Sequence, residues 1–132
     1  MNSDMNYYFN KTIASDFESV KKRVIEELGK EGFGILSEID VKATFEKKLE
    51  IDFRKYQILG ACNPHFAHKA ITAEDKIGTM LPCNVILQEL ENGDIEVAAI
   101  NATASMQAVE NSKVAEIAKE ISGRLKKVVD AL

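Results

Sequence analysis

Apolar side chains recur every three or four residues in two long segments, the spacing that places them on one side of an α-helix. The first segment carries the stripe Phe17, Val20, Val24 and Leu28. Ser15 and Glu18 have capping-box spacing at its start, and Gly32 suits a left-handed C-cap at its end. The second segment runs from about Ser112 to Ala131 and carries the stripe Val114, Ile117, Ala118, Ile121, Leu125, Val128 and Val129. Both segments are predicted to be long amphipathic helices.

Shorter stretches favour β-strands because apolar residues alternate in them or form brief runs. The predicted strands are residues 5–13, 33–39, 53–61, 83–90 and 94–101. Between the last two, Asn92-Gly93 is a strong hairpin signal, since a two-residue turn needs positive φ at both positions. Residues 102–110 show no clear pattern.

Two short helices are predicted between the strands. Asp40 can cap a helix that carries the apolar stripe Val41, Phe45 and Leu49. Asn63 and Pro64 suit the N-cap and first position of another helix, which would run to about Ile71.

Strands and helices intermix along the chain, a definite hairpin is present, and no linker or internal repeat interrupts the pattern. We therefore predict a single α+β domain over residues 1–132. It would contain a mixed β-sheet of about five strands, two long helices packed on one face of that sheet, and short connecting helices. Residues 1–4 are expected to be flexible.

The composition is that of a globular protein, with 45% hydrophobic and 29% charged residues and a net charge of -4. No basic stripe offers a binding surface for nucleic acid, and no apolar run is long enough to span a membrane. The start MNSDMNYYFNK lacks the features of a signal peptide. We therefore expect a cytoplasmic protein whose two cysteines are reduced thiols.

Both cysteines and both histidines lie in two short segments, GACNPHFAHKA at 60–70 and LPCNV at 81–85. Cys62 precedes a predicted helix N-terminus, whose partial positive charge would favour a thiolate; alternatively it is a small apolar core residue. Asn84 stands among apolar residues, where a buried amide could hold the neighbouring loop or point at a ligand. Lys69 adds charge nearby, without a recognisable nucleophile.

Four of these residues have the right types for a zinc site. Cys62, Cys83, His65 and His68 would together supply two sulfur and two nitrogen ligands. Their spacing, however, matches no zinc ribbon or finger. The apolar residues between the two histidines indicate a helix with the histidines turned outward. We therefore predict that the protein binds no metal and no other cofactor. If a metal were bound, these four residues would be its candidate ligands.

The chain resembles a bacterial and archaeal family known as domain of unknown function 302. The resemblance runs nearly end to end, and its most specific parts are Gly60-Ala61-Cys62-Asn63-Pro64 and Leu81-Pro82-Cys83. It implies a compact α+β domain that pairs as a homodimer, with a shared pocket at these two segments and no particular activity. The positions of His65 and His68 are variable in the family, which counts against zinc.

These observations favour a homodimeric, non-enzymatic binding module. Its small-molecule pocket would form where Cys62, Asn63 and Pro64 meet a second group of residues, Pro82, Cys83 and Asn84. A thiol-based redox or sulfur-transfer protein that uses Cys62 and Cys83 is the alternative, and a purely structural dimer is a third possibility. No Ser-His-acid triad, Walker loop or dinucleotide fingerprint is present, which argues against an enzyme.

Overall fold

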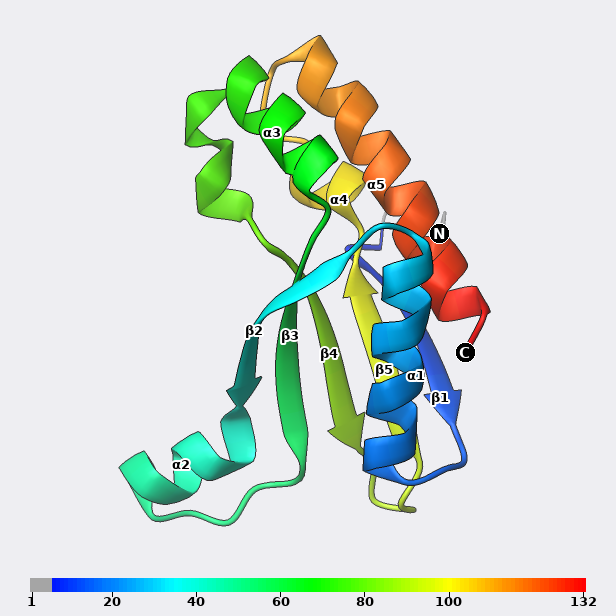
Figure 1. Ribbon diagram of the computed structural model, residues 1–132. Coiled ribbons are helices and arrows are strands. Elements are labelled where there is room, and N and C mark those ends of the chain that lie inside the picture. The colour runs from blue at the N-terminus through cyan, green and yellow to red at the C-terminus, as the bar shows by residue number, and fades with distance from the viewer. Residues whose placement is uncertain (1–5) are drawn as a thin grey trace.

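The computed structural model describes residues 6–132, so the expected flexibility of residues 1–4 concerns a segment outside the described residues. Its helices and strands are, in chain order, β1 Tyr8–Ile13, α1 Phe17–Lys30, β2 Gly34–Asp40, α2 Val41–Leu49, β3 Tyr56–Cys62, α3 Pro64–Ala73, the 3-10 helix η2 Asp75–Met80, β4 Cys83–Glu89, β5 Ile95–Ile100, α4 Ala102–Ser105 and α5 Ser112–Asp130 (Figure 1). The predicted α+β class with five strands is confirmed.

The five strands form one sheet in the order β1-β5-β4-β3-β2, and every neighbouring pair is antiparallel. The prediction of a mixed sheet is therefore wrong. Its physical reason is the placement of β1 and β2, which α1 connects. They lie at opposite edges of the sheet, so the helical crossover never makes two strands parallel neighbours.

Helices α1 and α5 lie side by side on one face of the sheet (Figure 1). Between these helices and the sheet lies the core, to which α1 contributes Val20, Val24 and Leu28 and the central strands contribute Leu59, Val85, Leu87 and Val97. Burying these side chains provides the main driving force for folding. Among the described residues, no helix is long and apolar enough to cross a membrane.

The opposite face of the sheet is much less covered. Successive strand residues point to opposite faces, so the neighbours of the core residues belong to this second face. Their side chains are half-buried or exposed, and the apolar ones include Tyr8, Ile39, Tyr56, Ile58, Ile86, Ala98 and Ile100. We call this surface the open face.

Helix α3 lies beyond the end of the sheet, alongside the N-terminal part of α5 (Figure 1). Its predicted start is confirmed, because Asn63 is the N-cap and Pro64 is the first helical residue. The helix ends at Ala73, two residues later than predicted. The side-chain amide of Asn111, the N-cap of α5, donates a hydrogen bond of 3.0 Å to the Ala73 carbonyl. This bond ties the start of α5 to the end of α3.

Two local predictions need correction. The N-cap of α1 is Asp16, whose carboxylate accepts from the Ser19 amide at 3.0 Å, instead of the predicted Ser15. In the hairpin, only Gly93 has positive φ, because the loop has three residues, 91–93, and is closed by a bond from the Leu90 amide to the Asp94 carbonyl. A three-residue loop needs the left-handed conformation at its last position alone.

Candidate functional site

A small hollow of about 310 Å³ opens where β3 passes into α3. One wall comes from the end of β3 and from α3, another from the segment between η2 and β4, and α5 adds Ile121. Almost all of the lining side chains are apolar, including Phe66, Ala67 and Ile71 of α3. The hollow could therefore hold a small apolar group, at the lower end of the size range of ligand pockets.

The structure brings four of the six predicted pocket residues to this hollow: Cys62, Asn63, Pro82 and Cys83. They meet because β3 and β4 are antiparallel neighbours, with Ala61 opposite Cys83, so the end of one strand adjoins the start of the other. Pro64 and Asn84 are not among the lining residues. Asn84 follows Cys83 along the strand, so its side chain points to the open face, where it is exposed instead of buried as predicted.

Asn63 is 8% exposed and holds the junction between β3 and α3. Its side-chain oxygen accepts from the Phe66 amide at 3.5 Å, and its side-chain nitrogen donates to the Glu31 carbonyl at 3.3 Å. A Cβ atom added at Gly32 would lie 2.7 Å from that nitrogen, and Gly32 also has a φ of 86°. Glycine is therefore needed there for both space and conformation.

The two cysteines are free, and they are diagonal neighbours on β3 and β4. Cys62 is half-buried, whereas Cys83 is 5% exposed. Burial, with a smaller contribution from nearby Cys62, raises the pKa of Cys83 from 9.0 to about 11. Cys83 is therefore a neutral thiol at physiological pH, the opposite of what a nucleophilic cysteine requires.

This raised pKa predicts a loss of stability in alkali. Between pH 9 and pH 11 the unfolded chain loses the Cys83 proton while the folded chain keeps it, so unfolding becomes easier as the pH rises. The contribution of Cys83 should fall by about 2–3 kcal/mol across that window. Urea denaturation of the wild type and of Cys83→Ala, compared at each pH, would measure it; parallel pH profiles would contradict the prediction.

The histidines lie apart from this hollow. His65 and His68 are both exposed on α3, and neither is among the residues that line it. Within residues 6–132, no three His, Cys, Asp or Glu side chains converge as a metal ion would require. The candidate ligands Cys62, Cys83, His65 and His68 therefore do not form a common site.

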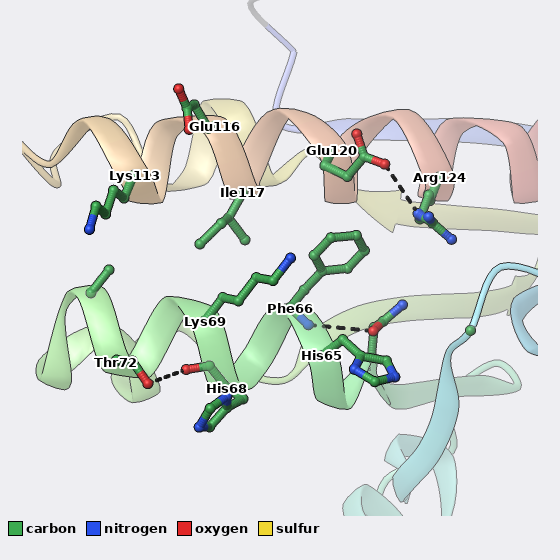
Figure 2. A pocket seen from close by; sticks show the side chains of 13 residues that line it. His65, Phe66, His68, Lys69, Thr72, Lys113, Glu116, Ile117, Glu120 and Arg124 are labelled. Carbon is green, nitrogen blue, oxygen red and sulfur yellow. Dashed lines mark hydrogen bonds and ion pairs between the residues drawn. The ribbon is translucent and has the colours of Figure 1, made fainter.

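A larger groove of about 940 Å³ runs between α3 and α5 (Figure 2). Phe66 and Ile117 supply its apolar surface, and Lys69, Lys113 and Arg124 supply positive charge. No local sequence pattern indicates this groove, because its two walls are helices separated by four intervening elements. The sequence identifies Lys69 as a charged residue near the predicted pocket, but it does not show that Lys113 and Arg124 lie across a groove from it.

Comparisons with known proteins agree with this fold. Residues 9–132 match the model of the family described as "Domain of unknown function DUF302". A crystal structure of an "uncharacterized conserved protein DUF302" from Bacillus stearothermophilus is similar, with a TM-score of 0.86 and 26% sequence identity. The match covers 94% of this chain and 96% of that one. The search of curated proteins found no match.

Proposed function

The chain belongs to the DUF302 family, and from that premise we propose that it is a homodimeric, non-enzymatic module that binds a small apolar molecule in the hollow beside Cys62 and Cys83. The observation that carries this proposal is the hollow itself, which is concave and lined almost entirely by apolar side chains. Leu36 and Ile71, which line it, are 69% and 46% exposed. Such exposed apolar side chains around a cavity are typical of a binding site.

The open face supports the dimeric part of the proposal. Five strands about 4.8 Å apart and about six residues long give a flat area of roughly 500 Å². The aromatic contacts Phe45–Phe53 and Phe53–Tyr56, with ring centres 5.1 and 6.5 Å apart, connect this face to α2, which buries no residue. Stable dimers bury roughly 800 Å² per partner, so the open face alone supplies more than half of that area, and α2 extends it. A second copy of the chain fits a surface of this size.

The thiol-based alternative receives no comparable support. A two-cysteine exchange mechanism needs one sulfur that readily becomes a thiolate. The raised pKa of Cys83 disfavours the thiolate at that position. We therefore treat the two cysteines as polarisable apolar surface for the ligand.

Titration with 1-hexanol, followed by amide chemical shifts in NMR spectra, tests the hollow. We expect saturable shifts at residues around Cys62 and Cys83. Ala67→Phe should weaken binding about tenfold or more, because the ring would occupy the space that about two methylene groups of the ligand need.

The matched control is Ala115→Phe, which adds the same ring to an exposed position of α5 outside the hollow. This variant should bind 1-hexanol as the wild type does. The proposal fails if 1-hexanol produces no saturable shifts near the hollow, or if Ala67→Phe, with a well-dispersed spectrum, binds equally well.

A further inference from the structure

We propose that the ligand is a small amphipathic anion, whose apolar tail occupies the hollow and whose acidic head is bound by Lys69 and Arg124 in the groove between α3 and α5. This assignment rests on the proposed function, because it needs the hollow to hold the tail. It adds the chemical class of the ligand and a second set of binding residues.

The hollow and the groove share a wall. Asn63 and Phe66 line both of them, and these are the two side chains that the cavities have in common. Asn63 is fixed by its hydrogen bonds to the ends of α1 and α3, which leaves Phe66 as the apolar partition. A molecule that contacts Phe66 from the hollow is therefore close to any group held on the groove side.

Two cations stand at this partition. The Lys69 ammonium lies 6.0 Å from the centre of the Phe66 ring, and the guanidinium carbon of Arg124 lies 5.1 Å from it. Figure 2 shows the ring between the two cationic groups, with Lys69 reaching from α3 toward α5. Each cation is stabilised by a cation–π interaction with the ring, and both lie on the groove side of this partition.

The two cations differ in their own partners. Arg124 donates to the Glu31 carbonyl at 3.2 Å and pairs with the Glu120 carboxylate at 3.5 Å. The side-chain ammonium of Lys69 has no hydrogen bond or ion pair with any residue between 6 and 132. Its ammonium group is thus available to a ligand carboxylate or phosphate, with Arg124 as a secondary contact.

The other charged side chains of the groove do not place negative charge beside Lys69, so an anion can bind there. In Figure 2 the Glu116 side chain points away from α3, and the Glu120 carboxylate is directed to Arg124. Lys113 extends toward α3 and adds a third cation, whereas His65 and His68 point away from α5. The charge that faces the partition is therefore positive.

Three probes share a six-carbon tail and differ in the charge of the head group: hexanoate, 1-hexanol and hexylamine. Comparing their affinities separates the contribution of the head group from that of the tail. Dissociation constants would be measured by NMR titration at low ionic strength. Hexanoate should bind about three- to fivefold more tightly than 1-hexanol, the gain expected of a partly exposed ion pair, and hexylamine should bind most weakly. Added salt should reduce the advantage of hexanoate.

Lys69→Gln should remove the preference for hexanoate over 1-hexanol and leave the affinity for 1-hexanol unchanged. The control Lys22→Gln removes the same charge from an exposed position of α1 and should keep the preference. Equal affinities of the wild type for hexanoate and 1-hexanol would overturn this inference and leave the proposed function standing. A preference that survives in Lys69→Gln would overturn it too, whereas failure of all three probes to bind would overturn the proposed function.

Discussion

Replacement of Gly60 by alanine is expected to lower the free energy of unfolding by about 2–3 kcal/mol, as overpacking of a well-packed site does. An added Cβ would press against the Ser37 hydroxyl and lie 2.8 Å from Cγ of Pro82. The serine side chain can rotate away, but the proline ring cannot. Either β3 or the segment before β4 would then have to shift, and Pro82 of that segment also lines the hollow.

Gly29→Ala provides the matched control for Gly60→Ala. Gly29 lies inside α1, and an added Cβ there would meet no atom within 4 Å. Alanine should therefore stabilise the protein by up to about 1 kcal/mol, because it is the better helix former. Urea denaturation monitored by circular dichroism measures both changes. An unchanged stability of Gly60→Ala would show that Pro82 adjusts without cost.

A Ser37→Gly background separates the two neighbours of Gly60. Removing the serine side chain leaves Pro82 as the remaining obstacle to an added Cβ. Gly60→Ala should therefore still be destabilising in that background, although less than in the wild type. A full recovery would assign the whole effect to Ser37 instead.

The helices and most strand positions could be predicted because their signals are local. The stripe of α5 and its start at Ser112 follow from the spacing of apolar residues, and Asn63 with Pro64 identifies the start of α3. The N-cap of α1 lies one residue beyond the predicted position, because Ser15 and Asp16 are both good caps. Only the geometry of the turn decides between them.

The pairing of strands is a different kind of information. Alternation identifies a strand but does not name its neighbours, so the antiparallel sheet was expected to be mixed. The face on which Asn84 lies is also not specified by the local pattern, because a shift of one residue moves a side chain from one face of a sheet to the other. The convergence of Cys62 and Asn63 with Pro82 and Cys83 was expected, since the two segments adjoin predicted strands. The groove of Lys69 and Arg124 depends on the packing of α3 against α5, which no local pattern specifies.

Replacement of Ile86 by glutamate is expected to convert the proposed dimer into monomers. Ile86 lies on the open face of β4, and β4 is the third of five strands in the sheet. Because the two partners of a symmetric dimer present the same surface, one substitution introduces two carboxylates into the interface. Burying unpaired carboxylates costs several kcal/mol, so the dimer should dissociate about a hundredfold more readily or worse.

Ile25→Glu is the control, because Ile25 is 37% exposed on α1, which lies on the other face of the sheet. Light scattering coupled to size exclusion, run over a wide range of protein concentration, gives the mass of each species. The wild type and Ile25→Glu should elute at twice the chain mass, and Ile86→Glu, with an unchanged circular dichroism spectrum, at the chain mass. A monomeric wild type would remove the dimer from the proposal, while an Ile86→Glu variant that still dimerises would place the interface on another surface. The side chains that line the hollow do not include Ile86 or the other apolar residues named for the open face, so the 1-hexanol titration tests the hollow independently of the dimer.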